Sequence, residues 1–180
     1  MTGTLGAGKG TVTDYLVRKR GFVHVSVSEF LAAEAVRRGL EANRQARHDI
    51  ANEYRSAGPT ALMEAVYRSV GEETARAILE PQHTPAEVHF IQSKGGVVLS
   101  VDASLETRYD RIRKRGSPKD NVSFEEFARF QELEMASSDP NKNNLGGAIA
   151  AADIHLTNDA EPETLYQAVD AALRKIGFVC

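Results

Sequence analysis

The stretch Met1-Thr2-Gly3-Thr4-Leu5-Gly6-Ala7-Gly8-Lys9-Gly10-Thr11 opens the chain and decides the fold class. Its glycines and lysine follow the spacing G-x-x-x-x-G-K, which is typical of a loop whose backbone N–H groups hold a di- or triphosphate. Glycines adopt left-handed dihedrals and let the backbone approach phosphates without a Cβ in the way. The stretch therefore predicts a nucleotide phosphate site built by Gly3, Gly6, Ala7, Gly8, Lys9, Gly10 and Thr11.

Two side chains of this loop have predicted roles. We expect Lys9 to reach the β- and γ-phosphates as a positive charge, beside the positive end of the helix that begins near Gly10. Thr11 carries the hydroxyl nearest the usual Mg²⁺ position, although the strict motif has Ser or Thr directly after the lysine. The alternative is a glycine-rich loop that only turns the chain. Four glycines and a lysine in register, followed by an amphipathic helix, favour the phosphate site.

Beyond the loop, the sequence alternates between extended and helical patterns. Expected strands cover residues 22–27, 75–79, 97–102 and 154–157, and expected helices cover 11–20, 29–38, 47–55, 60–70, 85–93, 105–115, 123–135 and 163–175. Residues 137–147 are expected to form a loop. This alternation predicts an α/β fold of three layers, α/β/α, with a parallel sheet covered on both faces.

The first strand of that sheet is expected to be missing. A phosphate loop normally follows an apolar strand, and only Met1 and Thr2 precede Gly3. A gene start placed too late, a truncated chain, or another way of holding the loop would each account for this. Losing a central strand removes several kcal/mol of burial, since each fully buried Val or Ile contributes about 1.5–3 kcal/mol.

Composition indicates one domain that spans residues 1–180. Apolar residues make up 42% and charged residues 26%, and the net charge of −3 provides no basic surface for nucleic acid or an anionic membrane. The single Cys180 excludes a disulfide framework, and the five histidines are not spaced for a metal site made by protein alone. Without an 18-residue apolar run or a signal peptide, the expected location is cytoplasmic. The chain is expected to be a monomer or a homodimer.

The form G-x-x-G-x-G-K-G-T, from Gly3 to Thr11, resembles the P-loop of adenylate kinase and its nucleoside monophosphate kinase relatives. Shorter matches in the same order extend to about Leu173. The resemblance implies a P-loop NTPase fold of the nucleotide kinase type, with ATP and Mg²⁺ as cofactors and a small nucleotide as acceptor. It also implies an acceptor-binding helical segment at about 28–74 and a short lid at about 111–122.

The acceptor side of this resemblance rests on two segments. Residues 25–31 (V-S-V-S-E-F-L) lie where adenylate kinases begin their acceptor-nucleotide helix, which makes Ser28 and Glu29 candidate contacts; a plain N-cap at Ser28 is the alternative. Residues 52–59 (N-E-Y-R-S-A-G-P) resemble a segment of nucleotide-kinase-like proteins close to dephospho-CoA kinase. Arg55 is then a candidate for the acceptor phosphate, and a solvated helix end is the alternative.

Residues 77–88 resemble the family pattern of a strand followed by (D/E)-x-x-R-x-P-x-E-V. Glu80, at the end of that strand, is implied to orient Mg²⁺-bound water or the acceptor. The alternative is an ordinary carboxylate at a strand end. His83 stands where the relatives have arginine, and a neutral imidazole does not replace a bidentate guanidinium on phosphate.

The lid and the adenine site are implied by two further segments. Arg111 and Arg115 share one helix face at i and i+4, where the resemblance implies a lid that stabilises the transferring phosphoryl group; a solvated basic face is the alternative. Residues 152–159 (A-D-I-H-L-T-N-D) resemble the strand end that seats adenine, and Asn158 is the residue carried over. Asp102 ends an apolar strand and either faces the crevice or caps the next helix.

These patterns predict ATP-dependent phosphoryl transfer to a nucleotide-like acceptor. The phosphate loop favours a nucleoside monophosphate, and the other motifs favour dephospho-coenzyme A. A nucleotide-binding regulatory protein without transfer activity is the alternative, because His83 replaces an arginine and no full strand precedes the loop.

Overall fold

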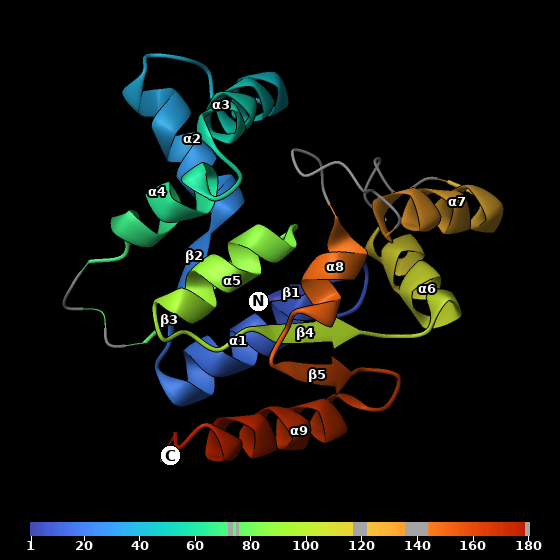
Figure 1. The fold of residues 1–180 in the computed structure, drawn as a ribbon. Helices are drawn as coiled ribbons and strands as arrows, with labels where there is room; N and C mark the ends of the chain where they lie inside the picture. The colour runs from blue at the N-terminus through green and yellow to red at the C-terminus, as the bar shows by residue number, and fades with distance from the viewer. Residues whose placement is uncertain (72–73, 75, 117–121, 136–143, 179–180) are drawn as a thin grey trace.

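Five parallel strands form the sheet in the computed structural model, which describes residues 1–180 except 72–73, 75, 117–121, 136–143 and 179–180. Their bounds are β1 (Thr2–Gly3), β2 (Val23–Ser26), β3 (Ala77–Glu80), β4 (Leu99–Asp102) and β5 (Ile154–Thr157). One ladder has the order β1-β4-β5 and the other pairs β2 with β3. Met1 joins the ladders, since its amino group donates to Leu79 O at 2.7 Å and its carbonyl accepts from Gln82 N at 3.2 Å. The strands therefore lie in the order β2-β3-β1-β4-β5 (Figure 1).

The expectation that the first strand is missing was wrong in part. β1 is only two residues long, but it pairs with β4 in register, Thr2 opposite Ser100 and Gly3 opposite Val101. Thr2 is fully buried, so its backbone groups must find partners inside the protein. The backbone of β4 pairs with Thr2, while Met1 bonds to Leu79 and Gln82 on the other side, which holds the phosphate loop at the centre of the sheet.

Helices cover both faces of the sheet, as the three-layer prediction required (Figure 1). One face carries α1 and α9, whose Val12, Leu16, Leu165 and Val169 share a buried cluster with Val101 and Leu156 of the sheet. The other face carries α5 and α8, through Val88 and Ala148. The bounds are α1 (Lys9–Arg20), α2 (Val27–Arg37), α3 (Arg44–Ala57), α4 (Ala61–Ser69), α5 (Pro85–Ser93), α6 (Leu105–Arg115), α7 (Phe124–Met135), α8 (Leu145–Ala150) and α9 (Pro162–Lys175).

Two groups of helices stand at either end of this core (Figure 1). Helices α2, α3 and α4 enclose a separate apolar cluster that includes Leu31, Ile50 and Met63. Helices α6 and α7 pack through Tyr109, whose ring lies 5.2 Å from that of Phe124 and 5.7 Å from that of Phe127. In the part of the chain that the structure describes, no helix combines the length and apolar character needed to cross a membrane.

Local signals account for the elements that match expectation most closely. Helix α5 has the predicted bounds because Thr84 and Glu87 form a reciprocal capping box and Pro85 occupies its first turn. Two expectations were wrong. The β-branched run at residues 22–27 is typical of a buried strand, but β2 is partly exposed because it is the edge of the sheet. Residues 145–147, expected in a loop, begin α8 (Leu145–Ala150), while residues 137–143 of that loop lie outside the described part.

Helix α8 was missed because its sequence, L-G-G-A-I-A, has weak helical propensity. Tertiary contacts stabilise it instead. Leu145 and Ala148 are buried, and the Asn144 side chain accepts a hydrogen bond from Gly147 N at 2.8 Å as an N-cap.

The packing of α9 on the sheet generates a stability prediction. Leu165 is 2% exposed within the core cluster, so Leu165→Ala should lower the free energy of unfolding by about 2–5 kcal/mol. Leu133 in α7 is 62% exposed, and Leu133→Ala should change it by less than about 0.5 kcal/mol. Urea denaturation of both variants measures the difference. Equal effects would contradict the assignment of α9 to the core.

Candidate functional site

The phosphate loop turns sharply between β1 and α1. Gly3, Gly6 and Gly8 have φ angles of 137°, 81° and 100°, all in the region that favours glycine. A Cβ on Gly3 would lie 2.0 Å from Val101 O, and one on Gly8 would lie 2.2 Å from Asn158 Nδ2. The loop therefore packs so closely against β4 and the end of β5 that these positions exclude other residues.

Lys9, the first residue of α1, lies against the loop. Its Nζ donates to Gly3 O at 2.7 Å and to Thr4 O at 2.8 Å. Burial lowers the pKa of Lys9, while the Glu80 carboxylate acts in the opposite direction and favours the charged form. Thr11 is half-buried one helical position beyond Gly10. The structure thus places the predicted cation in the concave side of a glycine loop.

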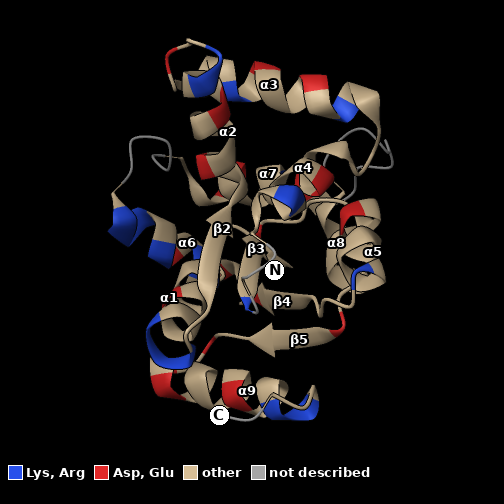
Figure 2. Cartoon of the chain, turned by 90° about the vertical axis from the view of Figure 1, so that its left-hand side faces the viewer, with Lys and Arg blue, Asp and Glu red and all other residues tan. Residues whose placement is uncertain are grey.

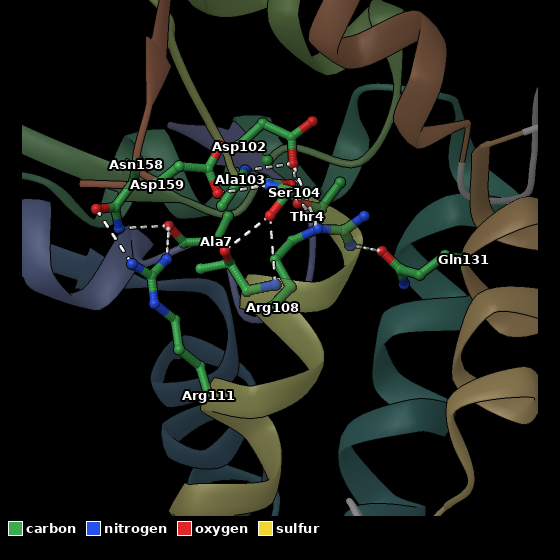
Figure 3. Close-up of polar contacts among 12 residues, drawn as sticks. Thr4, Ala7, Asp102, Ala103, Ser104, Arg108, Arg111, Gln131, Asn158 and Asp159 are labelled. Carbon is green, nitrogen blue, oxygen red and sulfur yellow. Dashed lines mark hydrogen bonds and ion pairs between the residues drawn. The ribbon is translucent and has the colours of Figure 1, made fainter.

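Asp102 links the loop to helix α6 (Figure 3). Its Oδ1 accepts from Thr4 Oγ1 at 2.5 Å and from Ala103 N at 2.8 Å, and it lies 3.6 Å from Arg108 Nε. The alternative role for Asp102, a helix cap, is wrong, because Ser104 caps α6 by accepting from Thr107 N. Asp102 therefore faces the loop at the carboxyl end of β4.

Arg108 is a buried site residue that our sequence reasoning missed. Its Nε donates to Ala103 O at 2.9 Å and its guanidinium also donates to Gln131 Oε1 of α7 (Figure 3). The available signal was its position four residues before the apolar Ile112, which places both on the buried face of α6. Arg108 of α6 therefore connects Asp102, at the end of β4, to Gln131 of α7.

Asn158 and Arg111 meet at the outer side of the loop (Figure 3). Buried Asn158 donates through Nδ2 to Ala7 O at 2.7 Å. Arg111 donates to the same Ala7 O and to Asn158 Oδ1, each at 3.5 Å. Three predicted site residues from distant parts of the chain are thus brought together.

Glu80 ends β3 on the same carboxyl edge of the sheet. Its Oε1 lies 3.0 Å from His24 Nε2 on the neighbouring strand, and His24 was not among the predicted site residues. The other carboxylate oxygen, Oε2, is buried and has no hydrogen-bond partner among the described residues. A buried, unsatisfied carboxylate oxygen beside a phosphate loop is suited to bind a water or a donor group of a ligand.

His83 follows β3 and lies near two cations. Burial is the largest cause that lowers the pKa of His83, and together with the positive charges of Lys9 and Arg55 it brings this pKa to about 4. The ring is therefore neutral at pH 7. The positive charge of Arg55, near the carboxyl end of α3, lowers the pKa values of both His83 and Glu87.

Ser28 and Glu29 are less closely tied to the loop. Helix α2 begins at Val27 with Ser26 as its N-cap, so the prediction of an N-cap at Ser28 was wrong. Both residues are exposed, and Ser28 Oγ accepts from Arg47 of α3 at 2.9 Å. They belong to the α2–α3 surface.

Arg115 is exposed at the last turn of α6, while Arg111 contacts the loop. Figure 2 shows the basic end of α6 at the outer edge of the molecule. Residues 117–121 of the predicted lid lie outside the described part of the chain. Within the residues described, no cluster of three or more His, Cys, Asp or Glu side chains is arranged to hold a metal ion.

Comparisons with known proteins agree with this geometry. A family model described as "AAA domain" matches residues 1–134. UPF0200 proteins of Hyperthermus butylicus and Pyrococcus abyssi are 28% and 26% identical, covering 91% and 98% of this chain and 86% and 95% of theirs.

Solved structures of other proteins superpose on most of this chain. Shikimate kinase from Bacteroides thetaiotaomicron superposes with a TM-score of 0.67 at 16% identity, covering 98% of this chain and 96% of that one. Shikimate kinase from Aquifex aeolicus gives 0.58 at 17%, covering 99% and 97%. The fold is that of P-loop kinases, as predicted; closeness to dephospho-CoA kinase is not shown.

The steric demands of the loop generate a matched pair of variants. Gly8→Ala should lower the free energy of unfolding by at least about 1–3 kcal/mol, because its φ is unfavourable for alanine and Asn158 would have to move. A Cβ on Gly10 meets nothing within 4 Å, so Gly10→Ala should be neutral or stabilising by up to about 1 kcal/mol. Urea denaturation separates the two; a neutral Gly8→Ala would contradict the described loop.

The neutral His83 generates a pH dependence. Its folded pKa of about 4 lies below the ordinary 6.5, so the unfolded chain binds the proton first as pH falls. Stability from this group is complete above pH 6.5 and is lost as pH falls toward 4. Between pH 7 and 4.5, the wild type should lose up to about 2 kcal/mol more than His83→Gln, measured by urea denaturation. Parallel losses would show that His83 is not buried.

Proposed function

Because the chain belongs to the AAA domain family, we propose that it transfers a phosphoryl group from ATP to a small, nucleotide-like acceptor. One observation carries the proposal. The glycine loop with Lys9, the carboxylates of Glu80 and Asp102, and the guanidinium of Arg111 all gather where β1, β3 and β4 end. Ligands bind at the carboxyl edge of such parallel sheets.

The residues present fit a nucleotide donor. Glycine backbone at positions that a Cβ would block leaves room for phosphate oxygens, and Lys9 offsets their charge. We propose that Asn158 and Arg111, which meet at Ala7 O, border the adenine. In this proposal the backbone N–H groups of the loop hold the donor phosphates, and Lys9 is the main side chain that contacts them.

The residues also fit Mg²⁺ held through water and phosphates rather than by a protein cage. Thr11 and Asp102 provide oxygen atoms beside the loop, and Glu80 Oε2 provides a buried acceptor without a partner in the described chain. When bound, Mg²⁺ would neutralise charge on the donor phosphates. Thr11 is the residue that we propose lies closest to it.

The transfer itself asks the protein mainly for position and charge. Lys9 and the loop N–H groups hold the donor, and Glu80 orders the water or acceptor next to it. Arg111, with Arg115 and the lid of residues 111–122, is proposed to stabilise the charge of the transferring group and exclude water. For Arg115 this requires α6 to move from the position it has here.

The proposed acceptor lies between the loop and the helical segment of residues 28–74. We propose that Arg55, whose charge acts on His83, contacts an anionic group there together with His83, and that Ser28 and Glu29 lie toward the outer end. A nucleoside monophosphate is the preferred acceptor, and dephospho-coenzyme A is the alternative within the same class.

One observation favours a second function, nucleotide binding without transfer. His83 is neutral at pH 7 in the position where the resembling kinases have a cationic arginine. A neutral imidazole gives less stabilisation to an acceptor phosphate than a guanidinium does. Such a protein would act as a nucleotide-dependent regulator.

A single assay separates the two. Purified protein is given Mg·ATP and, one at a time, nucleoside monophosphates, deoxynucleoside monophosphates and dephospho-coenzyme A, and ADP release is measured. Stimulation by one acceptor supports the kinase and names its class. ATP binding by calorimetry without any acceptor-dependent ADP supports the regulator.

Lysine variants connect the activity to the loop. Lys9→Ala should reduce acceptor-dependent ADP release by at least about a hundredfold, because it removes the charge on the donor phosphates. Lys19 lies exposed at the other end of α1, so Lys19→Ala should keep the wild-type rate. Circular dichroism checks that both fold. A Lys9→Ala variant with wild-type turnover would overturn the assignment.

A further inference from the structure

Glu134, in the last turn of α7, is an exposed carboxylate that the proposed mechanism does not use. Its Oε2 accepts a hydrogen bond from Gln131 Nε2 at 3.0 Å, about one helical turn earlier. Gln131 is 5% exposed, so the amide that holds Glu134 belongs to the interior of the protein. The carboxylate is therefore fixed by a buried group, although it lies at the surface itself.

This hydrogen-bond chain continues from Gln131 toward the phosphate loop. The Gln131 amide oxygen accepts from the guanidinium of Arg108, which is 7% exposed (Figure 3). Arg108 Nε donates to Ala103 O at 2.9 Å. The Arg108 backbone packs against the loop, since a Cβ on Gly6 would lie 2.7 Å from Arg108 O. Two buried side chains thus connect Glu134 to the loop.

The Gln131 amide serves both of its neighbours in one orientation. Its oxygen faces a guanidinium, which only donates, and its NH₂ group faces a carboxylate, which only accepts when ionised. The reverse orientation would lose both hydrogen bonds. The position of the Glu134 carboxylate is therefore set by Arg108 through this amide.

The charge of Glu134 acts on the lysine of the loop. Burial is the largest influence on the pKa of Lys9 and lowers it, while the negative charges of Glu80, Glu134 and Asp102 raise it, in that order of size. Lys9 is the side chain proposed to hold the donor phosphates. A negative charge that acts on Lys9 also acts, with the opposite sign, on a phosphate bound beside it.

In the part of the chain that the structure describes, the charged side chains that act on the pKa of Lys9 or contact the loop match Lys9 and its fellow cations in number. The three cations are Lys9, Arg108 and Arg111, and the three carboxylates are Glu80, Asp102 and Glu134. An excess of cations would favour any polyphosphate. A balanced set leaves the charge of a polyphosphate uncompensated, unless a divalent cation accompanies it.

We propose that Glu134 is a specificity-determining residue of the phosphate site, which disfavours a free polyphosphate and so selects a nucleotide that carries a divalent cation. The inference rests on the proposed function, because it takes the loop and Lys9 as the donor site. Free ATP carries more negative charge than Mg·ATP, so a fixed carboxylate repels the free form more strongly. Arg108 and Gln131 act as positioning residues that hold this carboxylate in place.

The test measures binding rather than turnover. Calorimetric titration of the 180-residue chain gives dissociation constants for Mg·ATP and for ATP in EDTA, and the wild type should bind Mg·ATP more tightly. Glu134→Gln should tighten the binding of metal-free ATP by about fivefold or more, and that of Mg·ATP by no more than about twofold. Glu134→Lys should tighten metal-free ATP further, because it reverses the charge.

The matched control is Glu132→Gln. Glu132 is exposed on the same helix and takes no part in the hydrogen-bond chain from Arg108 to Glu134, so this variant should bind both forms as the wild type does. Added salt should reduce the effect of Glu134→Gln, because salt screens charge but leaves packing unchanged. Circular dichroism verifies that all three variants fold.

Two results would overturn the inference alone. Glu134→Gln would bind both forms of ATP as Glu132→Gln does, or it would weaken Mg·ATP without tightening metal-free ATP, which would assign Glu134 to the metal instead. A wild-type chain that bound neither form would overturn the proposed function together with this inference. The two failures are therefore distinguishable in one set of titrations.

Discussion

The backbone of Met1 to Gly3 holds the two halves of the sheet together. Met1 bonds to β3 on one side, while Thr2 and Gly3 pair with β4 on the other. Without these three residues, the β2–β3 ladder and the β4–β5 ladder would share no backbone bond within the described chain. The phosphate loop begins at the last of them, so the placement of the loop and of Lys9 depends on this short strand.

From that centre, the site is assembled by the carboxyl ends of parallel strands. Glu80 ends β3, Asp102 ends β4 and Asn158 directly follows β5, so three polar residues more than twenty positions apart converge on one loop. The loop's glycines permit this convergence, because neighbouring atoms occupy the space where side chains would be. Polar contacts continue from this loop to α7: Thr4 donates to Asp102, Asp102 pairs with Arg108, and Arg108 donates to Gln131.

Charge is distributed unevenly around this loop. The charges of Lys9 and Arg55 help to keep His83 neutral, and Glu80 has one buried oxygen without a partner in the described chain. Cations that lower the pKa of a histidine also favour an anionic ligand beside them. A neutral His83 beside these charges is therefore compatible with the proposed binding of an anionic acceptor.

The sequence alone determined the loop, the alternation of strands and helices, and the ends of those elements that have local signals. Glycine spacing and the Thr84–Glu87 capping box act within a few residues, so they are readable without neighbours. Only the tertiary structure decided that β2 is an edge strand, that α8 forms from a glycine-rich segment, and that Met1 lies between β3 and β4. It also brought His24 to Glu80 and buried Arg108 beside Asp102. These outcomes depend on packing between segments far apart in the chain, where burial and pairing outweigh local propensity.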